Sequence, residues 1–183
     1  MKHLNTYITE YIVKKKLDKP IDSENHYDYF PKTKEELAAN IKELFDKGET
    51  NLNCIDTSAI TDMSYLFGTF NNIKNISFNV SNWNVINVTN MSYMFYDCKK
   101  FDCDLSSWDV SNVTDMQSMF YKSEFNGDIS SWDVSNVTYM SNMFNGSKFN
   151  RDISKWDVSN VINMLDMFYD CPLSKNKPKW YHK

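Results

Sequence analysis

The sequence predicts a repeat solenoid in which every coil of 24 to 25 residues supplies one short parallel strand and one short helix or turn. All five tryptophans recur at a nearly constant spacing, with separations of 25, 24, 24 and 24 residues. Methionine pairs three residues apart follow the same period, and a phenylalanine comes directly after each pair. One such unit cannot bury its own apolar face, so the units are expected to stack. The tryptophans are Trp83, Trp108, Trp132, Trp156 and Trp180.

Residues 132–135 carry the pattern of a strand with one buried face, because Trp132 and Val134 alternate with Asp133 and Ser135. Ile129 lies three residues before the tryptophan, which reproduces the L-x-x-L-x-L spacing of leucine-rich repeats. The predicted fold class is therefore leucine-rich-repeat-like. An asparagine follows each strand and is expected to bond the backbone of its own and the neighbouring coil, which gives the ladder Asn87, Asn112, Asn136 and Asn160.

A short helix is predicted in the second part of each coil. Thr138 is the expected N-cap of one such helix. Met140, Met143 and Phe144 follow at i, i+3 and i+4, which places them on one helical face. Thr89 and Thr114 occupy the capping position in earlier coils.

An N-terminal helical cap is predicted over residues 32–50. Thr33 and Glu36 form a capping box, and Gly48 ends the helix. A helix at the start of a repeat array shields the open end of its core. The apolar stripe of this helix consists of Leu37, Ile41, Leu44 and Phe45. The solenoid itself is expected to span residues 51–171, followed by a basic tail at 172–183.

A second, amphipathic helix is predicted within residues 1–17, ahead of a connector at 18–31. This helix either folds back on the solenoid, docks the chain in a larger assembly, or lies on a membrane surface. The candidate docking residues have helical spacing and are Leu4, Tyr7, Ile8, Tyr11 and Ile12.

The charge distribution argues against nucleic-acid binding. The formal net charge is −4, but residues 1–21 carry +3 and the tail from Pro172 carries +4, which leaves −11 for the residues between. A nucleic-acid-binding protein usually places its basic residues on the ordered face. No nucleic-acid partner is therefore expected.

The chain is not expected to cross a membrane or to carry a signal peptide, because no apolar run is long enough and residues 1–20 lack an apolar signal core. We expect a cytoplasmic protein of the producing cell, or a virion-associated one, which reaches a cell surface only through another export route. The cysteines Cys54, Cys98, Cys103 and Cys171 lack C-x-x-C spacing, so free thiols are expected, with a Cys98–Cys103 pair left open.

No catalytic residue, cofactor site or metal site is predicted. The phosphate-binding glycine motifs are absent, and His3, His26 and His182 have no ligand at metal-binding spacing. Two series of repeated acids suggest calcium, and they are Asp109, Asp133 and Asp157, and separately Asp104, Asp128 and Asp152. The glycine-rich nonapeptide of calcium-binding repeats is absent, however, and capping of a turn explains the second series more simply. The protein is therefore not expected to be an enzyme.

The candidate partner-binding surface is the outward face of the predicted strands. Short acidic and hydroxyl side chains recur there, and such a row favours a basic or polar patch on a protein partner. The alternative is a merely solvated face, which every solenoid needs. The residues are Asn84, Asp109, Asp133 and Asp157, with Ser111, Ser135 and Ser159 beside them.

The units W-D-V-S-N-V-T-D-M-Q-S-M-F and W-D-V-S-N-V-T-Y-M-S-N-M-F resemble the BspA-like leucine-rich-repeat family over about residues 52–171. This is a domain of unknown function found in bacterial surface proteins and in phages of gut bacteria. The resemblance implies adhesion or protein interaction without catalytic residues. Surface members carry a secretion signal or wall anchor, and neither is found here. The openings M-K-H-L-N-T-Y-I-T-E-Y-I-V and P-K-T-K-E-E-L are similar to phage-encoded members.

These observations together predict a non-enzymatic protein–protein interaction module. Two other roles remain open. One is a structural component of a virion or surface assembly, recruited through residues 4–12. The other is a carbohydrate or host-surface adhesin, for which exposed aromatic rings at Tyr96, Tyr121 and Tyr169 are candidates.

Overall fold

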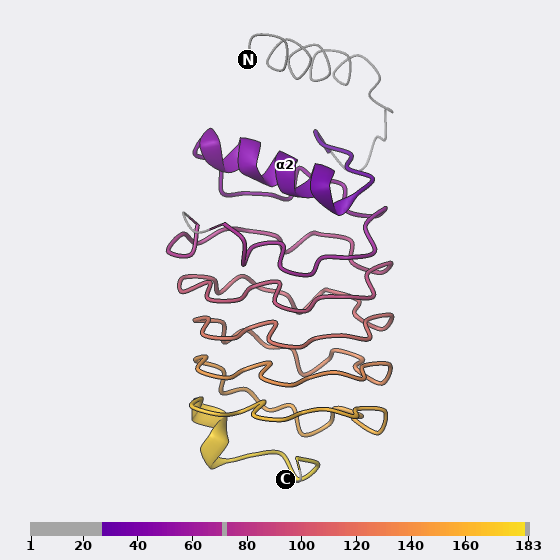
Figure 1. Ribbon diagram of the computed structural model, residues 1–183, viewed down its shortest axis with the longest axis vertical. Helices are drawn as coiled ribbons and strands as arrows, with labels where there is room; N and C mark the ends of the chain where they lie inside the picture. Colours follow the sequence, from indigo (N-terminus) through magenta and orange to yellow (C-terminus); the bar gives the residue numbers. More distant parts are fainter. Residues whose placement is uncertain (1–26, 71–72, 182–183) are drawn as a thin grey trace.

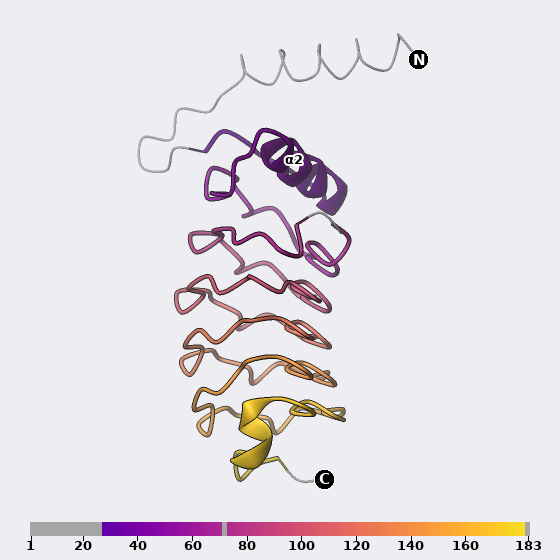
Figure 2. The ribbon, with the colours of Figure 1, turned by 90° about the vertical axis from the view of Figure 1, so that its left-hand side faces the viewer.

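The computed structural model describes residues 27–70 and 73–181, which form coils stacked along one long axis (Figures 1 and 2). Helix α2 (Lys34–Asp46) lies across the N-terminal end of the stack (Figure 1). The 3-10 helix η1 (Pro172–Lys175) lies at the other end. Neither of these helices has the length and apolar character that a membrane-spanning helix needs.

The predicted fold class, a leucine-rich-repeat-like solenoid with a strand and a helix in every coil, is wrong. Within residues 27–70 and 73–181, the regular elements are α2 and η1, and the coils contain turns and isolated parallel bridges but no sheet. One bridge recurs at the same position in successive coils and links Asp62, Asn90, Asp115, Tyr139 and Asn163 in turn. The described chain is therefore a stack of turn-rich coils.

Residues 140–146 show why the expected helix does not form. Asn142 and Gly146 have left-handed backbones, with φ of 57° and 67°, which a right-handed helix does not tolerate. The N–H groups of Met140 and Phe144 donate to the next coil at 2.8 and 3.0 Å instead of to their own segment. Pairing between coils thus replaces the local hydrogen bonds of a helix, and the i, i+3, i+4 spacing marks inward positions of a turn.

The threonine expected to cap that helix bonds the preceding coil instead. Thr138 Oγ1 donates to the carbonyl oxygen of Thr114 at 3.0 Å, and Thr114 Oγ1 donates to that of Thr89 at 3.1 Å. Thr89 continues the series to Thr61 at 3.3 Å. The recurring threonine therefore joins coils rather than starting helices.

Peptide groups of successive coils align head to tail along the stack. The N–H of Met116 donates to the carbonyl of Tyr139 at 2.9 Å, and the N–H of Met140 donates to that of Asn163 at 2.8 Å. A further column runs the opposite way, because the N–H of Thr138 donates to the carbonyl of Thr114 at 2.9 Å and that of Ile162 donates to Thr138 at 2.9 Å. The dipoles of the columns therefore cancel in part. Three parallel columns end at the carbonyls of Leu165, Met167 and Tyr169.

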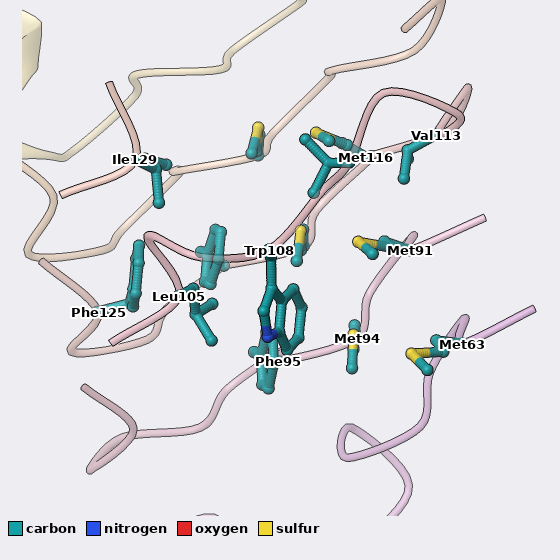
Figure 3. Close-up of a cluster of buried hydrophobic side chains, with 14 of the residues drawn as sticks. Met63, Met91, Met94, Phe95, Leu105, Trp108, Val113, Met116, Phe125 and Ile129 are labelled. Carbon is teal, nitrogen blue, oxygen red and sulfur yellow. The ribbon is translucent and has the colours of Figure 1, made fainter. Parts of the chain in front are cut away.

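Aromatic rings stacked from coil to coil fill the centre. Phe95 and Phe120 lie 5.5 Å apart between ring centroids, and Phe120 and Phe144 lie 5.8 Å apart, with planes within 8°. Figure 3 shows part of this core, with Trp108 beside Phe95 at 6.1 Å. A second column contains Phe101, Phe125 and Phe149. The inward placement of the periodic residues is thus confirmed.

Helix α2 covers the N-terminal end of this core, and its predicted cap and apolar stripe are confirmed. The N–H of Glu36 donates to Thr33 Oγ1 at 3.2 Å, and Leu37, Ile41 and Leu44 are buried. Phe45 is partly buried against the core. The helix therefore shields phenyl and aliphatic groups that the first coil leaves uncovered.

The C-terminal segment runs beneath the last coil (Figures 1 and 2). Trp180 stacks on Trp156 at 6.5 Å, and Tyr181 packs edge-on against Phe168 at 5.0 Å. Tyr181 therefore covers the ring face that a further phenylalanine would occupy in a longer stack.

Candidate functional site

The predicted polar row lies at one corner of four successive coils. Asn84, Asp109, Asp133 and Asp157 are all exposed, and the tryptophan before each of them is buried. The neighbouring Ser111 and Ser135 are half-buried, whereas Ser159 is exposed. The inward and outward alternation is therefore as predicted, although no strand produces it. We call Asn84, Asp109, Asp133 and Asp157 the polar row.

A turn, not a strand, orients each member of the polar row. Asp133 Oδ1 accepts a hydrogen bond from the N–H of Ser135 at 3.0 Å, and Val137 N–H closes the turn on the carbonyl of Val134 at 2.9 Å. Asp109 Oδ1 accepts from both the N–H and the hydroxyl of Ser111, at 3.1 and 2.6 Å. These are Asx turns, in which a short side chain replaces a backbone acceptor. Asn84 and Asp157 do the same with Ile86 and Ser159.

Successive corners are tied together by the predicted asparagine ladder. Asn136 Nδ2 donates to the carbonyl of Ser111 in the preceding coil at 2.7 Å, and Asn160 Nδ2 donates to that of Ser135 at 2.7 Å. Asn112 bonds Ile86 in the same way at 2.8 Å. The ladder to the neighbouring coil is thus confirmed, and it holds the polar row in register.

The turns also lower the pKa of two members of the row, Asp133 and Asp157. Hydrogen bonding from Ser135 holds the pKa of Asp133 below its ordinary value, against weaker repulsion from Asp157 in the next coil. Hydrogen bonding from Ser159 lowers the pKa of Asp157. These carboxylates are therefore charged at neutral pH despite their like-charged neighbours.

The ion pairs of the described residues leave the row out. The five ion pairs found in residues 27–70 and 73–181 join other residues, and none includes Asp109, Asp133 or Asp157. Each of these carboxylates has one oxygen engaged in its own turn. The row therefore presents three negative charges to solvent that no ion pair within the described ranges neutralises.

The second series of acids considered for calcium, Asp104, Asp128 and Asp152, forms another row of Asx turns. Asp128 Oδ1 accepts from the N–H of Ser130 at 3.0 Å, and Asp104 and Asp152 have equivalent serine partners at 2.9 and 2.8 Å. No cluster of three metal-ligating side chains occurs in the described ranges. The turn-capping interpretation of these acids is therefore confirmed by their hydrogen bonds. The D-x-S spacing in the sequence is the signal that would have predicted both rows.

Tyrosines occupy a different side of each coil. Tyr96 and Tyr121 stack at 5.0 Å with planes 2° apart, and Tyr65 and Tyr93 stack at 4.2 Å and 7°. One face of each ring is therefore covered by its stacking partner, although Tyr65 is still 46% exposed. Tyr169 is 66% exposed at the last coil.

The cysteine thiols of the described residues are not activated as nucleophiles. All four cysteines are free, so no disulfide joins Cys98 and Cys103. Burial raises the pKa of Cys98 to about 12, which keeps it protonated.

His3, His26 and His182 lie outside the described residues. So do the docking candidates Leu4, Tyr7, Ile8, Tyr11 and Ile12.

Comparison with models of protein families gives a match over most of the described chain. The model of the family described as "Mycoplasma protein of unknown function, DUF285" matches residues 38–124 and 121–182. No curated protein and no solved structure matches the chain.

Proposed function

The chain belongs to the family described as Mycoplasma protein of unknown function, DUF285, a family of BspA-like repeat proteins. Because the function of that family is unknown, we propose a function for this protein from its surface. The protein is a non-enzymatic interaction module. It binds a basic or polar patch of a protein partner on the polar row and the adjoining Ser111, Ser135 and Ser159. The observation that carries this proposal is the exposed charge of Asp109, Asp133 and Asp157, which no ion pair within residues 27–70 and 73–181 neutralises.

The rigidity of the row supports binding. An aspartate has a short side chain, and each one is already held by a hydrogen bond within its turn. A partner therefore orders few additional rotamers when it docks, which lowers the entropy lost on association. Regularly spaced negative charge also accelerates encounter with a basic surface.

The pKa shifts of the carboxyl and thiol groups argue against catalysis. A general acid needs a pKa near the working pH, yet the hydrogen bonds lower the pKa of Asp133 and Asp157. A thiol nucleophile needs a lowered pKa, yet burial raises that of Cys98. We therefore propose neither an enzymatic activity nor a cofactor.

Two other roles have less support. A carbohydrate adhesin stacks sugars on exposed ring faces, but Tyr96 and Tyr121 cover one face of each other, which leaves Tyr169 as the exposed ring among the three candidates. Recruitment into a virion or surface assembly depends on residues 4–12, which lie outside the described residues. This second role is compatible with partner binding on the polar row and stays a hypothesis.

The experiment is affinity capture from the producing cell or virion with the full chain, followed by mass spectrometry. The test variant reverses Asp109, Asp133 and Asp157 to lysine together. The matched control replaces Asp104, Asp128 and Asp152 by lysine. It changes the net charge by the same amount, but in the second row of Asx turns. The proposal is supported if a partner is lost with the test variant but kept with the control variant. It is contradicted if both variants capture the same proteins.

A further inference from the structure

The tripeptide Phe-Asn-Gly occurs twice in the chain, at residues 125–127 and 144–146. In both copies the phenylalanine is buried in the central ring columns, where Figure 3 shows Phe125. An asparagine followed by glycine is the dipeptide that deamidates most readily, because no side chain hinders the glycine nitrogen. The local sequence therefore predicts equal reactivity for Asn126 and Asn145, and a difference between them must come from the fold.

Deamidation joins the glycine nitrogen to the side-chain carbonyl carbon of the asparagine. The new C–N bond closes a cyclic imide, and the Cγ–Nδ2 bond breaks as ammonia leaves with the proton of the glycine N–H. Water then opens the imide at either carbonyl carbon, which yields aspartate or isoaspartate. The rate depends on the nitrogen that attacks, on the Oδ1 atom where negative charge develops, and on the Nδ2 atom that leaves.

These three atoms are favourably placed at Asn126. Among the described residues, nothing accepts a hydrogen bond from the N–H of Gly127 or from Asn126 Nδ2. Asn126 Oδ1 accepts a hydrogen bond of 2.9 Å from the N–H of Asn150 in the next coil. This donor stabilises the charge that develops on Oδ1 during the attack, as an oxyanion hole does. Asn126 and Gly127 are both half-buried, so water reaches them.

At Asn145 the attacking and leaving nitrogens are both engaged. The N–H of Gly146 donates to the carbonyl of Tyr169 in the next coil at 2.9 Å. Asn145 Nδ2 donates to Asn142 Oδ1 at 2.8 Å, and no described residue donates to Asn145 Oδ1. Gly146 is held in a left-handed turn, with φ of 67°. Reaction at Asn145 therefore requires a local opening of the stack.

Packing keeps glycine at position 127. Phe125 is fully buried, and a Cβ atom on Gly127 would lie 2.9 Å from Phe125 Cε2. The ring has no room to move aside, because Phe120 stacks on it at 4.2 Å. The equivalent positions of the neighbouring coils hold Cys103 and Arg151, so the coil itself does not demand glycine. The reactive dipeptide is thus a consequence of how Phe125 packs.

The fold also accommodates an aspartate at position 126. Asp102 occupies the equivalent position in the preceding coil, and its Oδ1 accepts the N–H of Asn126 at 3.0 Å. A carboxylate at 126 accepts the N–H of Asn150 in the same way. Arg151 Nε donates to the carbonyl oxygen of Asn126 at 2.8 Å, and Arg151 forms no ion pair within the described ranges. Its guanidinium therefore offsets the repulsion that Asp102 and Asp128 exert on the new charge.

We propose that Asn126-Gly127 is a self-modification site, at which the folded chain converts Asn126 to aspartate or isoaspartate with water as the co-reactant, while Asn145 is protected. The aspartate product adds one negative charge beside Asp102 and Asp128. The isoaspartate product lengthens the backbone and disturbs the pairing with the next coil. The site is separate from the polar row, and its chemistry does not depend on the function proposed above.

The test incubates the full folded chain in heavy-oxygen water at mildly alkaline pH, beside a sample unfolded in guanidinium chloride. Trypsin in ordinary water then releases residues 123–148 as one peptide, because it cleaves after Lys122 and Lys148. Fragmentation mass spectrometry of this peptide measures conversion at Asn126 and Asn145 separately. The heavy oxygen marks conversion that preceded digestion.

In guanidinium chloride the two asparagines should react at similar rates, because their neighbours are the same. In the folded chain Asn126 should react at least roughly tenfold faster than Asn145, which must first break two hydrogen bonds. A ratio of rates in the folded chain that is no larger than the ratio in guanidinium chloride overturns the proposal. The variant Asn126→Asp should melt within about 2 °C of the unmodified chain. A larger loss would contradict accommodation of the aspartate product.

Discussion

Trp132 Nε1 donates a hydrogen bond of 3.0 Å to the carbonyl oxygen of Leu105 in the preceding coil. Trp132 is 4% exposed, so the same side chain fills the core and joins two coils. Five tryptophans repeat this bond, at 2.9–3.2 Å. The period of the tryptophans is therefore the period of a hydrogen-bonded ladder.

Trp132→Ala should lower the free energy of unfolding by about 3–5 kcal/mol, as a large core truncation does. It also leaves the carbonyl of Leu105 without its donor. Trp132→Phe keeps an aromatic ring but loses the indole N–H, so it should cost less than the alanine variant. Urea denaturation monitored by circular dichroism measures both. Equal losses for the two variants would mean that the hydrogen bond carries the whole effect and the ring volume none of it. A negligible loss for Trp132→Phe would mean that the ladder contributes nothing.

Asp133→Ala should cost about 1 kcal/mol, because it removes a side-chain cap from the N–H of Ser135. Asp133→Asn should cost much less, since Asn84 forms the same turn with an amide oxygen. The comparison separates the turn from the charge. If the two variants melt at the same reduced temperature, the charge and not the cap stabilises this corner.

Stability should fall as the pH is lowered through the aspartate range. Hydrogen bonds depress the folded-state pKa of Asp104, Asp128, Asp133, Asp152 and Asp157 below the ordinary 3.8. A depressed pKa gives stability that is present above the unfolded value and is lost as the pH falls through the folded value. The melting temperature should therefore be flat above about pH 5 and drop below about pH 4. A variant with asparagine at all five positions should show a weaker drop, and an unchanged drop would assign the acid sensitivity to other groups.

The turn at Asn142 can be tested by two substitutions that a helix and a left-handed turn rank in opposite order. With φ at 57°, Asn142→Val should destabilise by about 1–2 kcal/mol, and Asn142→Gly should be nearly neutral. In a helix, glycine would be the worse of the two. The free energies of unfolding of both variants, measured by denaturation, decide between the conformations. Greater stability of the valine variant would show that residue 142 lies in a helix.

The sequence predicted the features that depend on burial and local capping. The periodic tryptophans require stacking, and the alternation at Trp132 to Ser135 correctly placed Asp133 outward. The Thr33 cap and the stripe of α2 were also predictable, because their partners lie within one helical turn.

The path of the backbone within each coil was not predicted. The Met-Met-Phe spacing fits a helix and a run of turns equally well, and the decisive bonds join residues about 24 positions apart. Asn142 and Gly146, which tolerate left-handed backbones, carried the missing signal, but Tyr93 and Lys122 adopt the same conformation without such a preference. Local propensity was therefore overridden by pairing between coils.

The central claim, binding through the polar row, is tested most directly by measuring association with the captured partner as salt is raised. The variant Asp109→Asn/Asp133→Asn/Asp157→Asn keeps the turns and removes three charges. The unmodified chain should associate at least about tenfold faster than this variant at low salt, and the difference should shrink at high salt. Equal association rates and equal salt dependence for the two proteins would contradict the claim.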